Sequence, residues 1–393
     1  MKKFKKIILI VADSLGVGEA VDAELYGDKN TNTLGNIVKN CPDIKMPNLD
    51  KLGIRHFLGD KVTPNACLAR LTEISVGKDT LTGHFEMMGL KVDKPFPSFT
   101  ETGFPQELID DLEKFSGRNV IGNISASGTE IIKDLGMEQL ETGALIVYTS
   151  ADSVLQIAAN EEIIPLEELY KICAYARKIT IENPQWMVGR IIARPFVGRS
   201  VETFKRTTNR HDYALKPFSK TCLNVLSENG FDTIAVGKIN DIFDGYGINE
   251  YVRTTSNEDG MDKTIDFAKT DFTGLCFVNL VDFDALYGHR RDVLGYKLAI
   301  ERFDEKLGIL LDQIDSDTLV MVTADHGNDP THTGTDHTRE DVPLICYYKG
   351  IEGKVLPTME SFTVISSTIL DNFGLEKISK YPGFLNLLGD ENV

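Results

Sequence analysis

The amino-acid sequence predicts an α/β protein with a central, mostly parallel sheet and a smaller inserted α+β domain. Three apolar runs, at 6–12, 274–281 and 318–323, each have the length of a buried strand, and each leads directly into polar residues. After about residue 217, such runs alternate with helical patterns, an order typical of parallel sheets. Between about residues 95 and 217 the sequence pattern changes, which favours a second domain there.

The run at 6–12 is interpreted as the first buried strand. It resembles a signal peptide superficially, but it is short, Asp13 ends it and no clean small-residue cleavage site follows. No apolar run reaches the roughly 18 residues that a membrane helix needs, so no membrane span is expected.

The middle of the chain is expected to form a cap domain at 96–216, inserted between core segments 1–95 and 217–393. Proline-rich patches near residue 95 and a proline at 217 bound this segment. Inside it, the patterns predict a strand at 143–148, a helix from Leu166 and a strand at 186–193.

The second core segment continues the alternation of strands and helices. Its patterns predict a strand at 233–237, an amphipathic helix at 294–314 and a late strand at 342–348. Candidate site residues occur in both core segments, so we expect the two segments to fold as one unit.

Composition limits the classes of function. The formal net charge of −17 argues against a nucleic-acid-binding surface, which would need a basic patch. An anionic substrate would have to be held by local positive charge, from metal ions and a few Arg or Lys side chains. The six cysteines form no CxxC pair, which fits reduced thiols in a cytoplasmic protein. No protein partner is evident.

Carboxylate and imidazole groups gather just after the predicted strands. Asp325 and His326 follow the strand at 318–323, and His337 comes shortly afterwards. Such groups are costly to bury unless paired or metal-bound, and open α/β sheets bind ligands at the carboxyl ends of their strands. For any one of these residues, a helix-capping Asp or a surface His is the alternative interpretation. Because four of the seven histidines occur beside carboxylates in this way, we predict a metal site.

The expected metal ligands come from three strand ends. They are Asp13, Asp284, His289, Asp325, His326 and His337. Six groups are too many for one ion and suit two ions about 3.5–4 Å apart, the arrangement that clamps a phosphoryl group during in-line transfer. Oxygen and imidazole ligands without thiolate favour Mn²⁺, with Zn²⁺ and Mg²⁺ as alternatives. His332 is expected nearby but not as a ligand, and Asp284 is preferred to Asp282.

Thr80, in the segment 77–83, is the candidate nucleophile. The alternative is a flexible turn whose Thr or Asp caps a helix, and this segment alone favours that interpretation. The functional interpretation is a hydroxyl at a helix N-terminus, activated by a metal and suited to carrying a phosphate. The segment is not a Walker A loop, because Asp79 follows Gly77 and Lys78 where Ser or Thr is required.

Polar residues of the cap are candidates for holding a substrate. Ser150 and Asp152 follow the predicted strand at 143–148, where an ordinary capped turn is the alternative; Asp152 could accept hydrogen bonds from sugar hydroxyls. Four arginines lie close together near the end of the cap: Arg190, Arg194, Arg206 and Arg210. Each alone would be a solvated surface residue, but as a group they could hold a phosphate. Lys238, directly after the strand at 233–237, is expected at the same rim.

Together, these segments resemble the alkaline phosphatase superfamily and, more narrowly, the phosphopentomutase family. The resemblance covers essentially the full length, and it is carried by segments 13–19, 77–84, 148–153, 209–213, 282–291 and 323–329. The Asp-His-Gly run at 325–327 is shared with other members of the superfamily, whereas the combination is narrow. Phe85 stands where many members have Trp, which is a conservative change.

The resemblance implies an alkaline-phosphatase-like core, an inserted cap and two Mn²⁺ ions. One ion would be held by Asp13, Asp325 and His326, next to Thr80, and the other by Asp284, His289 and His337. The implied activity interconverts α-D-ribose 1-phosphate and D-ribose 5-phosphate, and the 2-deoxyribose pair. Phospho-Thr80 would pass its phosphoryl group to the sugar monophosphate and form a 1,5-bisphosphate. Catalytic glucose 1,6-bisphosphate or ribose 1,5-bisphosphate would prime the enzyme.

The resemblance places the substrate contacts in and beside the cap, and two other functions remain open. The expected contacts are Ser150, Asp152, Arg190, Arg206 and Lys238. A metal-dependent phosphatase or a phosphoglycerate-type mutase would share the metal ligands. A non-catalytic protein that binds a metal or a phosphosugar is the alternative from another class, although it would have little use for Thr80.

Overall fold

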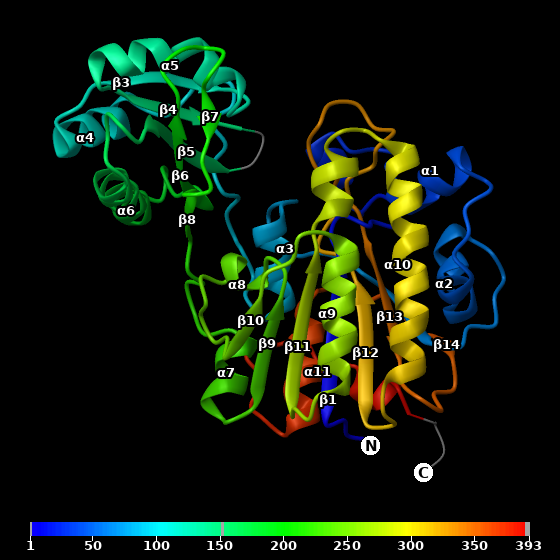
Figure 1. The fold of residues 1–393 in the computed structure, drawn as a ribbon. Coiled ribbons are helices and arrows are strands. Elements are labelled where there is room, and N and C mark those ends of the chain that lie inside the picture. Colours follow the sequence, from blue (N-terminus) through cyan, green and yellow to red (C-terminus); the bar gives the residue numbers. More distant parts are fainter. Residues whose placement is uncertain (1, 151–152, 390–393) are drawn as a thin grey trace. The chain divides into compact units, whose positions relative to one another are not determined.

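The computed structural model describes residues 2–150 and 153–389. The chain divides into two compact units, Met1–Lys94 with Pro217–Val393, and Pro95–Lys216. We call the first the core unit and the second the inserted unit, and describe each by itself (Figure 1). No helix within the described ranges is long and apolar enough to cross a membrane.

The core unit is built on an eight-stranded sheet with the order β10-β9-β11-β1-β12-β13-β2-β14. Its strands are β1 (Lys6–Ala12), β2 (Cys67–Leu71), β9 (Asp232–Val236), β10 (Glu250–Val252), β11 (Gly274–Leu280), β12 (Thr318–Thr323), β13 (Val342–Tyr347) and β14 (Lys354–Val355). The five strands from β10 to β12 are parallel, whereas β13 runs antiparallel to both β12 and β2. The predicted mostly parallel sheet is therefore confirmed, with an antiparallel strand towards one edge.

The centre of the core sheet explains why three apolar runs end in polar residues. Strand β1 pairs in parallel with β11 on one side and β12 on the other, and every residue of the three strands is buried. Ala12 lies opposite Leu280, and Val11 lies opposite Thr323. The carboxyl ends of the three strands therefore meet at one edge, where the next residues of each segment come together.

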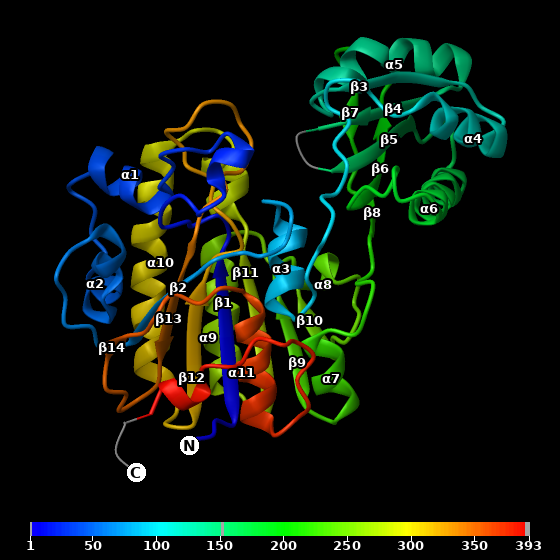
Figure 2. The same ribbon diagram turned by 180° about the vertical axis from the view of Figure 1, so that it is seen from behind.

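Helices cover both faces of the core sheet (Figures 1 and 2). They are α1 (Thr33–Asn40), α2 (Pro47–Leu52), α3 (Thr80–Met87), α7 (Cys222–Glu228), α8 (Ile239–Ile242), α9 (Asn257–Lys269), α10 (Val293–Gln313) and α11 (Thr363–Phe373). On one face α9 packs beside α10, which also contacts α1 and α2; on the other face α11 contacts α3 and α7. Short 3₁₀ helices span Ala23–Tyr26, Ile54–Leu58 and Leu385–Leu387, and a π-helical turn spans Phe283–Gly288.

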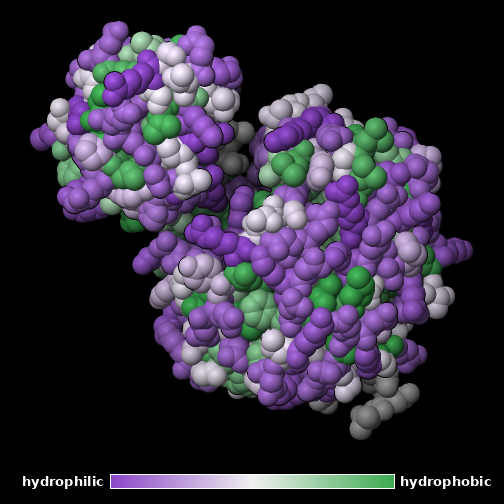
Figure 3. Space-filling model, viewed as in Figure 1, coloured by the Kyte–Doolittle hydropathy of each residue, from purple (hydrophilic) through white to green (hydrophobic). Residues whose placement is uncertain are grey.

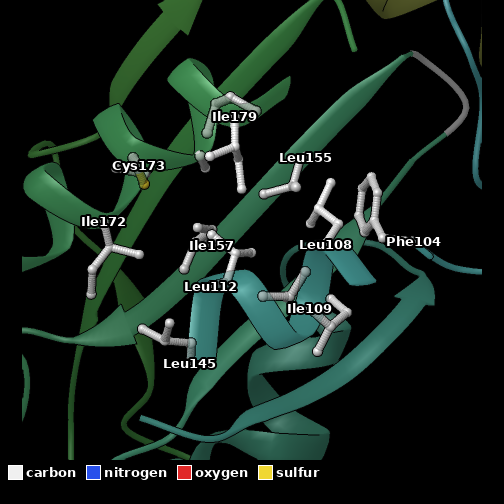
Figure 4. Packing of buried hydrophobic residues seen from close by; sticks show 14 of the residues in the cluster. Phe104, Leu108, Ile109, Leu112, Leu145, Leu155, Ile157, Ile172, Cys173 and Ile179 are labelled. Carbon is white, nitrogen blue, oxygen red and sulfur yellow. The ribbon is translucent and has the colours of Figure 1, made fainter. Parts of the chain in front are cut away.

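The inserted unit is a six-stranded sheet with helices on both faces. Its elements are α4 (Gln106–Ser116), β3 (Val120–Ser125), α5 (Glu130–Thr142), β4 (Leu145–Thr149), β5 (Val154–Asn160), α6 (Leu166–Glu182), β6 (Arg190–Val197), β7 (Lys205–Arg206) and β8 (His211–Ala214). Figure 4 shows α4 and α6 packing their apolar side chains onto one face of β4 and β5, where Leu155 and Ile157 lie between them. Helix α5 packs on the opposite face, against Ile146 and Phe196.

The strand predicted at 186–193 is wrong at its start. After α6 the chain turns, with backbone hydrogen bonds from Trp186 to Asn183 and from Val188 to Trp186, so β6 begins only at Arg190 and continues to Val197. Trp186 is buried in the core of the inserted unit from this turn. The apolar residues that suggested a strand are thus explained by burial of a loop.

The face drawn in Figure 3 is mostly polar. In Figure 3 hydrophilic residues predominate over each unit, and hydrophobic residues occur in small scattered groups. The cysteines contribute nothing to this surface, since all six are free thiols in buried positions.

Candidate functional site

Asp13 lies in a strained turn directly after the end of β1. Its carboxylate is almost completely buried. The next residue, Ser14, has a φ of 74°, a left-handed conformation that is rare outside glycine and is often found at functional sites. Backbone groups of Ser14 bond Asp325 Oδ1 (3.0 Å) and the Asn328 amide (3.2 Å). The turn therefore locks the end of β1 to the segment after β12.

A first cluster combines Asp13, Asp325 and His326. The ligand atoms of these three buried side chains all lie within 4.8 Å of one another. His326 Nε2 is 3.6 Å from Asp13 Oδ1 and 3.4 Å from Asp325 Oδ2. Two carboxylates and one imidazole in a buried space form a donor set suited to a divalent cation.

A second cluster adjoins the first and combines Asp284, His326 and His337, again with ligand atoms within 4.8 Å of one another. Asp284 Oδ2 lies 3.4 Å from His337 Nε2 and 3.0 Å from His289 Nε2. The rings of His326 and His337 are 4.0 Å apart between centroids. His326 thus belongs to both groups, and the structure brings the six residues expected as metal ligands into one continuous site.

The hydrogen bonds of the imidazoles suit metal binding. His326 Nδ1 lies 3.0 Å from the Gly327 carbonyl oxygen and His289 Nδ1 lies 2.6 Å from the Thr335 carbonyl oxygen, so each Nδ1 is placed to donate. This tautomer leaves the Nε2 lone pairs directed at the carboxylates, as in carbonyl-bonded histidine ligands.

The carboxylates also fit a bound cation. Asp13 Oδ1 and Asp325 Oδ2 are buried and have no hydrogen-bond partner among the described residues. Burial, reinforced by the charges of Asp325 and Asp284, raises the pKa of Asp13 well above its ordinary value. Buried acids of this kind are stabilised when a cation replaces the missing donors.

Thr80 is the first residue of α3, and its hydroxyl faces the first cluster. Thr80 Oγ1 lies 3.2 Å from His326 Nε2. Asp79 caps the helix and accepts hydrogen bonds from the Thr82 amide (3.1 Å) and the Thr82 hydroxyl (2.6 Å). The hydroxyl of Thr80 is therefore held at a helix N-terminus beside a cation-binding cluster, which is a suitable place for a group that accepts and releases phosphate.

Several residues that the sequence did not reveal contact the clusters. His84 is fully buried, with Nδ1 2.8 Å from the Thr80 carbonyl oxygen and 3.2 Å from Asp325 Oδ2. Asn279 donates to Asp13 Oδ2 (2.8 Å), and Asn328 donates to Asp284 Oδ1 (2.7 Å). The spacing of His84 one helical turn after Thr80 was the available signal, whereas the two amides gave none.

Asp282 and His332 lie outside the clusters. Strand β11 ends at Leu280 and a π-helical turn follows, so Asp282 and Asp284 do not point the same way. Asp282 instead accepts a hydrogen bond from the Asn257 amide (2.8 Å) at the start of α9. His332 Nε2 lies 3.7 Å from Asp28 Oδ1, near the site but in neither cluster.

The polar residues of the inserted unit share one face of its sheet. Gln156 and Asp212 both lie opposite Ile192, and Arg190 and Arg194 alternate with Ile191 and Ala193 on β6, so these side chains occupy the same face. Arg194 donates to Gln156 (3.0 Å), which donates to the Ser150 hydroxyl (3.4 Å), and Arg190 pairs with Asp212 at 3.6 Å.

Arg206 shares this face of the sheet with Arg190 and Arg194, whereas Lys238 belongs to the other unit. Arg206 lies on the short strand β7, opposite Phe196. Lys238 belongs to the core unit, where it precedes α8 directly after β9 and Gly237. Asp152 lies outside the described residues.

Comparison with known proteins places the chain first in a broad class. Residues 5–377 match the model of the metalloenzyme superfamily. The chain is therefore a metal-dependent enzyme with an α/β core. Among solved structures, Leishmania mexicana phosphoglycerate mutase has a TM-score of 0.49 at 15% identity and covers 98% of this chain and 97% of its own. The PH0037 protein of Pyrococcus horikoshii has a TM-score of 0.48 at 16% identity, covering 98% and 99%.

Sequence identity then identifies one family within this superfamily. The chain is 54% identical over 381 residues to the phosphopentomutase of Clostridium botulinum, an alignment that covers 95% of this chain and 96% of the relative. The chain belongs to the phosphopentomutase family.

Proposed function

We propose that this protein is a phosphopentomutase, an isomerase that interconverts α-D-ribose 1-phosphate and D-ribose 5-phosphate, and the 2-deoxyribose pair. The family relationship over nearly the whole chain supports the reaction. The observation that carries the mechanism is the position of Thr80 Oγ1, 3.2 Å from His326 Nε2 at the edge of the two clusters.

Thr80 carries the phosphoryl group in the working enzyme. The free hydroxyl of a sugar monophosphate attacks phospho-Thr80; a new P–O bond to the sugar forms and the bond to Thr80 Oγ1 breaks. The proton lost by the sugar hydroxyl is balanced by protonation of Thr80 Oγ1, and the product is a 1,5-bisphosphate. Transfer of the other phosphoryl group back to Thr80 releases the isomeric monophosphate and restores the phosphoenzyme, so no phosphate is consumed.

Asp13, Asp325 and His326 would hold one cation, and Asp284, His289 and His337 the other. We propose Mn²⁺ at both positions, supported by the carboxylate and imidazole donors. Bound ions would supply positive charge for the oxygens of the transferring group and lower the pKa of the Thr80 hydroxyl. His84, Asn279 and Asn328 orient the acids of this set through the contacts described above.

For the sugar phosphate we keep the contacts predicted from the sequence. Ser150, Arg190 and Arg206 of the inserted unit and Lys238 of the core unit remain our candidates, and Asp152 keeps the role predicted from the sequence. Guanidinium groups bind phosphate bidentately, which supports the two arginines. A sugar bisphosphate, either glucose 1,6-bisphosphate or ribose 1,5-bisphosphate, primes Thr80. The buried free cysteines support a reducing, cytoplasmic setting.

Phosphorus NMR tests this function directly. Purified protein with Mn²⁺ and a trace of glucose 1,6-bisphosphate should convert ribose 1-phosphate to ribose 5-phosphate without accumulation of inorganic phosphate. Growing inorganic phosphate would identify a phosphatase instead. Inactivity on pentose phosphates together with turnover of 3-phosphoglycerate would identify a phosphoglycerate-type mutase.

A further inference from the structure

Arg339 places a buried guanidinium group next to the segment that leads to Thr80. The residue is only 2% exposed, and all five of its N–H groups have acceptors. Nε and Nη2 each donate to the Asp22 carboxylate at 3.0 Å. Nη1 donates to the Glu73 carboxylate and to the Gly77 carbonyl oxygen (2.6 Å), and Nη2 donates to the Glu73 carbonyl oxygen (2.7 Å).

The acceptors of Arg339 identify what it holds. The carbonyl groups of Glu73 and Gly77 mark the two ends of segment 73–77, and Thr80 follows three residues later. Asp22 comes from the loop after β1, and Arg339 itself comes two residues after His337. One side chain therefore joins the segment before Thr80 to the chain segments that carry Asp13 and His337.

Helix α3 holds the same segment from its other side. Glu86, a fully buried residue of α3, accepts hydrogen bonds from the Ile74 amide (3.1 Å) and the Ser75 amide (2.6 Å). Lys78 is fixed by Asp28 (2.9 Å), which also accepts the backbone amide of Arg339 (2.8 Å). Segment 73–77 is thus hydrogen-bonded to α3 through Glu86 and to the segment that follows His337 through Arg339.

We propose that Arg339 is a positioning residue for phosphoryl transfer. It holds segment 73–77 so that Thr80 Oγ1 stays beside His326 Nε2. This inference rests on the proposed function, because it concerns transfer through Thr80. A displacement of about 1 Å at a reacting group can lower a rate on the order of 100-fold. Lysine cannot replace the guanidinium, since its ammonium group has three donors and lacks the planar fork.

A cavity beside Arg339 makes chemical rescue practical. It has a volume of about 400 Å³ and is lined by Arg339, Tyr26 and Glu73, among others. The guanidinium carbon lies 5.1 Å from the centre of the Tyr26 ring. Guanidinium ion added to an Arg339→Ala variant can therefore occupy the vacated position between the ring and the carboxylates.

The test compares Arg339→Lys and Arg339→Ala with the wild type. We expect kcat for ribose 1-phosphate to fall about 10- to 100-fold with KM and Mn²⁺ content close to wild type. Phosphorylation of Thr80 by glucose 1,6-bisphosphate, followed by mass spectrometry, should slow by a similar factor. Millimolar guanidinium should restore kcat in Arg339→Ala, and methylammonium should not. Arg177→Lys is the matched control, since Arg177 is a buried arginine of the inserted unit that donates to the Val188 carbonyl oxygen.

The outcomes separate positioning from a purely structural role. Unchanged kcat in a folded Arg339→Lys variant, or a fall in kcat that only follows lost metal, would overturn the proposal. If the Arg339 variants do not fold, Asp22→Asn replaces them, because it weakens the hydrogen bonds that the Arg339 guanidinium donates to Asp22. An unchanged kcat in this variant would likewise overturn the proposal. If the wild type is phosphorylated on Thr80 but does not convert pentose phosphates, only the proposed function is refuted. The rates of Thr80 phosphorylation in the variants would then still test whether Arg339 positions Thr80. Absence of Thr80 phosphorylation in the wild type would refute both.

Discussion

Gly83 packs directly against the backbone of Asp325. A Cβ atom on Gly83 would lie 2.2 Å from the Asp325 carbonyl oxygen, a distance that no side chain tolerates. Gly83 lies one turn after Thr80 on α3, so this contact lets the N-terminus of the helix approach the segment that carries Asp325 and His326. The glycine is required here for the close approach of two backbones.

Substituting Gly83 with Ala should therefore damage transfer more than stability. The methyl group must push α3 away from Asp325, and we expect kcat to fall on the order of 100-fold because Thr80 moves with the helix. Steady-state kinetics and a crystal structure of the variant measure the effect. Gly308→Ala is a suitable control, since the nearest atoms that a Cβ there would meet belong to the side chain of Asn48 and not to a backbone. Wild-type kcat in Gly83→Ala would show that the contact is unimportant for transfer.

Removal of the Thr80 hydroxyl should abolish mutase activity and leave the metal clusters intact. Thr80→Ala loses the oxygen that carries phosphate, whereas its neighbours Asp325 and His326 keep their contacts with each other. Metal analysis should give wild-type Mn²⁺ content, and mass spectrometry should detect no phosphoenzyme. Thr80→Ser retains a hydroxyl and should keep part of the activity. Full activity in Thr80→Ala would exclude this residue as the nucleophile.

Neutralising Asp325 should remove both metal and activity. Asp325→Asn takes a charged donor from a buried cluster, and we expect Mn²⁺ affinity to fall by about 100-fold or more. Titration calorimetry with Mn²⁺ measures this change. Asp282→Asn serves as the control, because Asp282 lies near in sequence to Asp284 but bonds the start of α9 instead. Equal affinity in Asp325→Asn and wild type would contradict the assignment.

The stability of the metal-free protein should depend on pH through Glu340. This side chain is buried, and burial raises the pKa of Glu340 to about 7 from an ordinary value of 4.5. Between these values the folded protein keeps a proton that the unfolded chain releases. The free energy of unfolding should therefore decrease as pH rises through this window, by about 1.4 kcal/mol per pH unit, and the contribution is lost above pH 7.

Denaturant unfolding at pH 5, 6, 7 and 8 tests the role of Glu340. Glu340→Gln keeps the size and an acceptor for Thr33 and Thr338 but cannot ionise. The wild type should lose stability relative to this variant with rising pH. A constant difference between the two proteins across this range would refute the prediction.

The sequence predicted the site best where site residues follow the carboxyl ends of neighbouring parallel strands. Apolar runs defined β1, β11 and β12, and parallel pairing then brought Asp13, Asp284 and Asp325 to one edge. The helix expected at 294–314 and the strand expected at 342–348 are also confirmed, because their apolar faces are long and regular.

The residues that the sequence did not reveal depend on contacts between distant segments. The contact between His84 and Asp325 follows from the close approach of α3, which no local pattern indicates. Arg339 has ordinary neighbours in the sequence, and its burial is visible only when Asp22 and Glu73 surround it. The choice between Asp282 and Asp284 depended on where β11 stops, and strand ends are poorly determined by hydrophobic pattern alone.

The central place of β1 has a consequence for how the protein is made. Strand β1 ends at Ala12, yet its two neighbours in the sheet end only at Leu280 and Thr323. At synthesis rates of about 5–20 residues per second, this buried strand waits roughly 15–50 s for its first partner. The inserted unit is synthesised during this interval. During this interval the apolar side chains of β1 lack the strands that bury them in the folded protein, so chaperones that bind apolar segments can recognise β1.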